Sequence, residues 1–191
     1  MASPYAHRPH RDHPHRQRLS ARLILLAAAL ATLAALPVTA QVSPAQAEMK
    51  DRDGQVVAKA LLRETPAGML LLINMAGLPP GAHGFHIHET GKCEPPFDSA
   101  GGHLAESGTA HGFFRQDGPH IGDMPNIHMP ETGVLELEVL TLVTDMDAQL
   151  FDDDGAALII HEGADDYRSQ PSGAAGPRLA CGVIVKQRDA N

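Results

Sequence analysis

Short stretches of alternating apolar and polar residues run along most of the chain after position 44. In residues 45–50 small or apolar side chains alternate with Gln, Glu and Lys, and residues 56, 58, 60 and 62 place four apolar side chains on one face. A period of two is typical of β-strands with one buried face. The predicted strands are residues 45–50, 56 to about 65, 69–76, 83–89, 134–143, 156–161 and 179–185.

No stretch carries a sustained helical period, and turn residues separate the short strands. This pattern predicts an all-β protein, an antiparallel sandwich or barrel. Tryptophan is absent and aromatic residues make up only 4% of the chain, so the core is expected to consist of Val, Leu, Ile and Ala.

Two long irregular segments, about Thr90–Gly133 and Glu162–Pro177, interrupt the strands. An unstructured loop of the first segment's length is uncommon in a compact domain and needs something to order it. The first segment is rich in glycine, proline and histidine. A bound metal ion is the organiser that this composition favours.

The first 40 residues have the layout of a secretory signal peptide. A basic stretch ends at Arg22, an uncharged run follows over 23–36, and small residues stand at Val38 and Ala40. The 14-residue run is shorter than the ~20 residues that span a bilayer. We therefore predict cleavage after Ala40, a mature domain over 41–191, and a periplasmic or secreted protein with no membrane attachment. The rival site Ala45-Gln46-Ala47 would remove most of the first strand.

Charge is distributed unevenly between the leader and the mature chain. The whole sequence has a formal net charge of −8, which divides into +4 for residues 1–40 and −12 for the remainder. An acidic body makes nucleic acid and anionic membrane surfaces poor partners. The histidines at 7, 10, 13 and 15 lie in the leader and are interpreted as polar filler that is removed with it.

Three histidines on predicted strands form the first candidate metal site. His86 and His88 stand at i and i+2, so both side chains project from one face of their strand, ~6.6 Å apart along the backbone. His161 ends the apolar strand 156–161. Each histidine alone is weak evidence, but together they can form an all-imidazole site, which favours copper.

A second candidate site lies in the first irregular segment. His103, His111, His120 and Asp123 fall within 21 residues, among many glycines. Three imidazoles and one carboxylate form a four-ligand set that suits tetrahedral Zn²⁺. The alternative is a solvated polar loop, but a loop of this length and glycine content cannot order itself by burying apolar side chains.

Five motifs together give the sequence a family resemblance. They are Gly-Phe-His-Ile-His-Glu at 84–89, Ala-Gly-Gly-His at 100–103, Gly-Pro-His-Ile-Gly-Asp at 118–123, His-Glu-Gly-Ala-Asp-Asp at 161–166 and Gly-Pro-Arg-Leu-Ala-Cys-Gly-Val-Ile at 176–184. In this order and spacing the chain resembles the copper–zinc superoxide dismutases. The run Asp-Asp-Tyr-Arg-Ser-Gln-Pro at 165–171 resembles the bacterial, exported branch.

The resemblance implies a Greek-key, immunoglobulin-like β-sandwich or barrel in which two long loops carry function. It implies one copper and one zinc ion per chain and superoxide as the substrate. Copper ligands would be His86, His88, His103 and His161; zinc ligands would be His103, His111, His120 and Asp123. His103 would bridge the two ions and act in catalysis.

Further roles follow from the same resemblance. Asp165 would hydrogen-bond His86 and His111 and fix their rings, and Arg178 would attract the anionic substrate. An even pair of cysteines in an exported chain favours a disulfide, and the resemblance implies that Cys93 and Cys181 form it. The chain departs from the family at 104–106, where Leu-Ala-Glu replaces the usual Phe-Asn-Pro.

Two histidines match no ligand position: His83 is interpreted as a strand-entry residue and His128 as a loop residue. A metal-carrying binding protein of this fold would lack a copper ligand or the arginine, and an adhesion domain would not need seven metal-ligand positions. A copper-only member is disfavoured by the zinc set. Both a monomer and a homodimer are compatible with the sequence.

Overall fold

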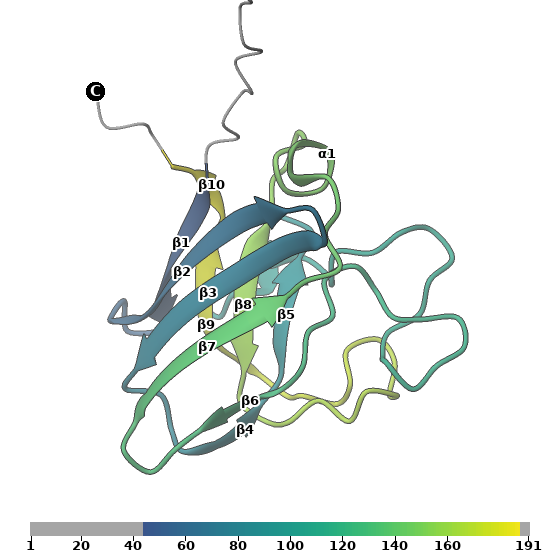
Figure 1. The fold of residues 1–191 in the computed structure, drawn as a ribbon. Coiled ribbons are helices and arrows are strands. Elements are labelled where there is room, and N and C mark those ends of the chain that lie inside the picture. Colours follow the sequence, from purple (N-terminus) through teal and green to yellow (C-terminus); the bar gives the residue numbers. More distant parts are fainter. Residues whose placement is uncertain (1–43, 188–191) are drawn as a thin grey trace, which may run out of the picture. The chain divides into compact units, whose positions relative to one another are not determined.

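The computed structural model of the protein describes residues 44–187. The predicted leader lies outside these residues. Antiparallel strands dominate the described chain (Figure 1). They are β1 (Ala45–Asp51), β2 (Val56–Thr65), β3 (Gly68–Ala76), β4 (Gly81–His83), β5 (Phe85–His88), β6 (Ile127–Met129), β7 (Val134–Leu140), β8 (Ala157–His161), β9 (Arg178–Val183) and β10 (Val185–Lys186).

The larger sheet curls around a single core. Its strand order is β5-β8-β9-β1-β2-β3-β7, with β10 added to β1, and β4 and β6 form a separate small sheet. Figure 1 shows β2, β3 and β7 crossing in front of β9, β8 and β5. Strands distant in sequence pair at β5–β8 and β3–β7, through crossover connections. The predicted antiparallel all-β class is confirmed.

Alternation along the strands builds the core. In β1, Ala45, Ala47 and Met49 are buried, whereas the residues between them are exposed. The same alternation recurs in β3 and on the inner face of β7. β8 is buried along its whole length and is an interior strand, paired with β5 on one side and β9 on the other.

The two long connections, 89–126 and 162–177, are held against β5 and β8. Isolated bridges pair His88 with His103 and His86 with Asp123, so the first loop runs back beside β5. At Gly122 any Cβ would collide with the carbonyl oxygen of Ile87, so only glycine permits this approach. The loops are therefore ordered next to the strand that carries two of the candidate ligands.

Some local structure was not predicted. Residues Met146–Leu150 form a short helix α1, whose first turn is capped by the side chain of Asp145 accepting from Ala148 N. The strand predicted to reach Val143 ends at Leu140. His128, interpreted as a loop residue, lies exposed on β6, and His83 lies buried at the end of β4. Among the described residues no helix is long and apolar enough to cross a membrane.

Candidate metal centre

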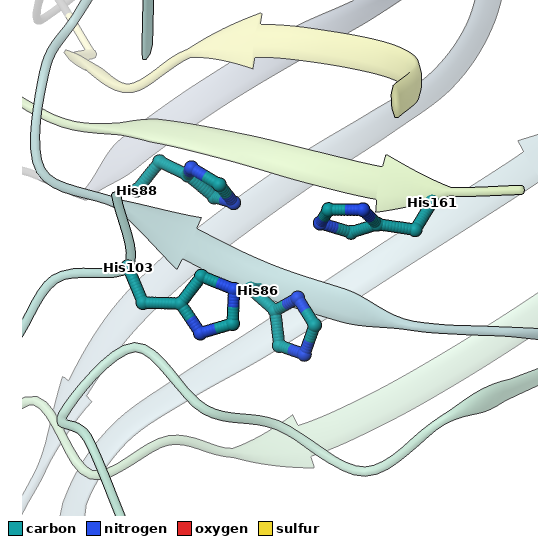
Figure 2. Close-up of side chains that lie close together, drawn as sticks. All are labelled: His86, His88, His103 and His161. Atoms are coloured by element: carbon teal, nitrogen blue, oxygen red, sulfur yellow. The ribbon is translucent and has the colours of Figure 1, made fainter. Parts of the chain in front are cut away.

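Four buried histidines meet where β5, β8 and the first loop come together. His86 and His88 lie on β5, His161 ends β8, and His103 stands on the loop beside His88. Figure 2 shows the four rings close together. One ring nitrogen of each lies within 4.8 Å of the corresponding atom of the others. The predicted copper residues are therefore brought together by the fold.

Each of these histidines has one buried ring nitrogen without a hydrogen-bond partner. The atoms are His86 Nδ1, His88 Nε2, His103 Nε2 and His161 Nε2. Buried polar atoms without partners are rare and need a reason. Four such atoms that point into one space fit a cation that accepts imidazole lone pairs.

The opposite ring nitrogens fix which tautomer two of these histidines adopt. His88 Nδ1 donates to the carbonyl of Gly101 at 3.0 Å, and His161 Nδ1 donates to that of Gly176 at 3.0 Å. A carbonyl oxygen only accepts, so the ring proton is on Nδ1 and the lone pair is on Nε2. Both rings therefore turn a ligand lone pair towards the shared space.

The second group surrounds Asp123. Asp123 Oδ1 lies 2.8 Å from His103 Nδ1, 2.9 Å from His111 Nδ1 and 3.8 Å from His120 Nδ1. Its other oxygen accepts from the backbone N–H groups of Gly112 and His120, which fixes the carboxylate. His120 Nδ1 is buried and has no hydrogen-bond partner. Three imidazoles and one carboxylate thus converge as a zinc site requires.

A second group of four side chains, whose ligand atoms lie within 4.8 Å of one another, differs in one member from the predicted zinc set. It contains His86, His103, His111 and Asp123 but not His120, whose Nδ1 lies 3.8 Å from Asp123 Oδ1. His103 belongs to both groups: Nε2 is the unpartnered atom on the all-histidine side, and Nδ1 faces Asp123. One ring therefore joins the two sites.

Asp165 links the sites from behind. Its Oδ2 accepts from His86 Nε2 at 2.9 Å, and its Oδ1 accepts from His111 Nε2 at 3.0 Å. With Nε2 donating, Nδ1 of His86 carries the free lone pair, whereas Nδ1 of His111 faces Asp123 and offers a lone pair only after its ring proton is lost. The second loop thereby orients one residue of each group.

The electrostatics differ between the two sides. Burial lowers the pKa of His86 to about 3 and that of His161 to about 4, and it lowers the pKa of His88 well below its usual value. These rings are therefore neutral at neutral pH. Burial also acts to lower the pKa of His111, but hydrogen bonds to Asp123 and Asp165 outweigh it and raise that pKa to about 9. The two carboxylates thus favour positive charge at this point.

Arg178 stands at the start of β9, half-buried beside the histidines. Its guanidinium donates to the carbonyl of Phe97 and, at 2.6 Å, to that of Gly101. Burial lowers the pKa of Arg178, but the guanidinium remains charged. Its positive charge also lowers the pKa values of His88 and His161. A fixed cation therefore lies next to the all-histidine site.

A disulfide fastens the loop that receives Arg178. Cys93 and Cys181 are bonded, with Cα atoms 5.6 Å apart and 88 residues between them in sequence. Around the bridge, Phe97, Ala100 and Ile159 form a small apolar cluster. The predicted disulfide is confirmed, and it ties the loop carbonyls to the same strand as Arg178.

Three polar residues that the sequence analysis did not single out hold the two loops together. Asn126 exchanges two hydrogen bonds of 2.8 Å with the backbone of Asp165, and its N–H donates to the hydroxyl of Tyr167. Gln170 does the same for His111, accepting from its N–H and donating to its carbonyl. Side-chain amides in loops carry no periodic signal, so the sequence pattern could not reveal these contacts.

Comparison with known proteins gives one family. The family described as "Copper/zinc superoxide dismutase (SODC)" matches residues 53–184. "Superoxide dismutase [Cu-Zn] 2" of Aquifex aeolicus is 49% identical over 146 residues, which cover 73% of this chain and 85% of that protein. "Superoxide dismutase-like protein YojM" of Bacillus subtilis is 37% identical over 145 residues, covering 72% of this chain and 74% of that protein.

Solved structures agree with the sequence comparisons. The Cu/Zn superoxide dismutase of Brucella abortus has a TM-score of 0.64 at 29% identity and covers 74% of this chain and 99% of its own. A double mutant of a SOD-like protein from Bacillus subtilis has a TM-score of 0.69 at 36% identity and covers 72% and 95%. The fold thus has counterparts among solved structures, and the chain belongs to the copper/zinc superoxide dismutase family.

Proposed function

We propose that this chain is a superoxide dismutase that binds one copper and one zinc ion, with the ligands divided as the two groups suggest. The family contains both dismutases and proteins named only as dismutase-like, so the chain's own site carries the argument. The decisive observation is the set of unpartnered ring nitrogens. We assign copper to His86, His88, His103 and His161, and zinc to His103, His111, His120 and Asp123.

The chemistry that bound copper supplies is one-electron exchange with superoxide, by which two superoxide anions and two protons give O₂ and H₂O₂. The chain's residues hold the ligand atoms in place before any metal arrives. Hydrogen bonds to Gly101, Gly176 and Asp165 prevent the rings from turning. Rings held in this way need no reorganisation when they bind.

His103 is the residue that we assign to both ions. A neutral imidazole has one lone pair, so binding through both nitrogens requires the loss of its ring proton, which adjacent divalent ions favour. If Nδ1 of His103 stays bound to the ion on the Asp123 side, Nε2 is the ring nitrogen that can accept and release a proton. His103 therefore serves as a proton carrier next to the substrate position.

Arg178 is assigned to substrate attraction. Superoxide is an anion, and the mature chain has a formal charge of −12, so a local positive charge must offset the overall repulsion. Two carbonyl contacts hold the guanidinium beside the copper histidines. A fixed cation at the mouth of a site draws anions towards it and raises their rate of encounter, and we assign this role to Arg178.

We also propose that the protein is exported and cleaved after Ala40. Two observations support this. The disulfide needs an oxidising compartment, and β1, which pairs with β2 and β9, begins at Ala45. Cleavage after Ala47 would remove part of that strand. The intact mass of the exported protein tests the proposal, and a mature chain starting at Glu48 would refute it.

Metal content and superoxide consumption together test the dismutase assignment. We expect about one copper and one zinc per chain, with activity that disappears in His161→Ala as copper is lost. His128→Ala is the matched control, because this histidine is exposed on β6 and belongs to neither group of candidate ligands. A fully metal-loaded protein that does not consume superoxide would exclude the enzymatic function while leaving the metal assignment in place.

A further inference from the structure

Glu89 lies directly after β5 and contacts the turn that leads into His103. Its backbone N–H donates to the carbonyl of Gly102 at 3.0 Å, and its Oε1 accepts from the N–H of Gly102 at 2.8 Å. The side chain also lies against Gly101, where an added Cβ would meet Glu89 Oε1 at 2.8 Å and Cγ at 2.9 Å. One exposed glutamate therefore contacts two consecutive glycines of the first loop.

The two glycines contribute little rigidity of their own to this turn. Gly101 has a φ of +74°, and an ordered glycine loses more conformational freedom than any other residue. Within residues 44–187, the other side chains that hydrogen-bond to either glycine are those of His88 and Arg178, both at the carbonyl of Gly101. These two belong to the proposed site itself. Glu89 therefore supplies the side-chain hydrogen bond that holds the turn from outside the site.

The turn fixes the position of three functional groups. The carbonyl oxygen of Gly101 accepts from His88 Nδ1 at 3.0 Å, which leaves the lone pair of that ring on Nε2. The same oxygen accepts from the guanidinium of Arg178 at 2.6 Å. His103, which we assign to both ions, follows Gly102 directly in the chain. A displaced turn would therefore disturb two copper ligands and the substrate-attracting arginine together.

We infer that Glu89 is a positioning residue for the copper site, whose carboxylate fixes the glycine turn and, through it, the two ligands and the arginine. Among the described residues its carboxylate makes no hydrogen bond to a candidate ligand, so it acts through the backbone of the turn. A hydrogen bond to an ionised acceptor is stronger than one between neutral groups, which suits an exposed position. The inference rests on the copper assignment proposed above.

Two substitutions separate the hydrogen bond of Glu89 from its charge. Glu89→Gln removes the negative charge but keeps an oxygen that can accept from the N–H of Gly102, whereas Glu89→Ala removes both. The two variants have the same net charge, so a difference between them reports the side-chain contact. We expect Glu89→Ala to lower the affinity for copper about tenfold, because a partner that orients a metal ligand is lost. Glu89→Gln should keep the wild-type affinity.

Three measurements on the zinc-loaded protein follow the effect without the use of superoxide consumption. Competition with a chelator of known affinity gives the dissociation constant for copper. The electron paramagnetic resonance spectrum of bound copper(II) reports its ligand geometry and should change in Glu89→Ala only. Titration with azide, a small anion of the same charge as superoxide, reports the placement of Arg178. Glu89→Ala should bind azide more weakly than Glu89→Gln does.

Glu94→Ala is the matched control. Glu94 is an exposed glutamate of the same loop, and its carboxylate makes no hydrogen bond or ion pair among the described residues. This variant should keep the wild-type copper affinity and spectrum, and thermal unfolding of each variant checks that the fold is retained. The inference is wrong if Glu89→Ala binds copper as the wild type does, or if Glu89→Gln loses as much affinity as Glu89→Ala. A wild-type chain that binds no copper would overturn the copper assignment, and this inference with it.

Discussion

Replacement of Asp165 by asparagine isolates the contribution of the link between the two sites. In the wild type both carboxylate oxygens accept ring N–H groups, Oδ2 from His86 and Oδ1 from His111. Asparagine has the same shape but only one acceptor oxygen. Its amide group would face one of the two ring N–H groups, so one histidine loses its acceptor and meets a second donor.

The size of the effect follows from the contacts. A hydrogen bond to a charged partner contributes about 1.5–3 kcal/mol, and loss of the partner that orients a metal ligand typically lowers metal affinity about 10–100-fold. Both estimates agree, because a tenfold change corresponds to about 1.4 kcal/mol. We expect Asp165→Asn to lower the affinity for zinc, for copper, or for both within this range.

Competition with chelators of known affinity measures the dissociation constants for copper and for zinc in one titration series. Asp166→Asn is the control, because Asp166 is an exposed carboxylate one position further along and accepts only from loop residues such as Arg168 and Ser169. Asp165→Asn with wild-type affinity for both metals would show that the ring orientations do not depend on this carboxylate, and the reasoning would fail.

Three further substitutions each test a different part of the site. Gly173→Ala should release zinc, because its Cβ would collide with Asp165 Oδ1, whereas Gly176→Ala, also at positive φ but with its nearest atom 4.0 Å away, should only lower the melting temperature. Metal analysis distinguishes them, and equal zinc loss would contradict the argument. Arg178→Ala should slow superoxide consumption without metal loss, most strongly at low ionic strength, where charge is least screened. If the variant kept the wild-type rate at every salt concentration, Arg178 would have no role in the mechanism. Cys93→Ser should lower the free energy of unfolding by about 2–5 kcal/mol, measured by denaturant titration, and an unchanged midpoint would show that the bridge adds no stability.

The strands and the candidate ligands could be predicted because both leave regular traces in the sequence. Alternation marks β1 and β2, and the spacing of His86 and His88 puts both side chains on one face of β5. Helix α1 escaped prediction because five residues are too few to show a helical period. Only its capping residue, Asp145, gave a local signal.

The contacts between loops could not be predicted from the residues alone. Asn126 and Gln170 act on backbone atoms 39 and 59 residues away, and nothing local distinguishes them from other polar loop residues. The place of Asp165 behind both groups was expected from family resemblance only. Such contacts depend on how two loops pack against each other. Sequence patterns indicate the individual strands and helices but not how the connecting loops pack.

Main-chain carbonyl oxygens anchor much of this site, and that affects how it can evolve. Gly101 O accepts from both His88 and Arg178, Gly176 O accepts from His161, and Phe97 O accepts from Arg178. A side-chain substitution does not delete a main-chain oxygen. The loop sequences can therefore drift while the acceptors persist, provided that the backbone path is kept. Selection is then expected to act on the few glycines and the disulfide that set the path, and to leave the remaining loop positions free to diverge between lineages.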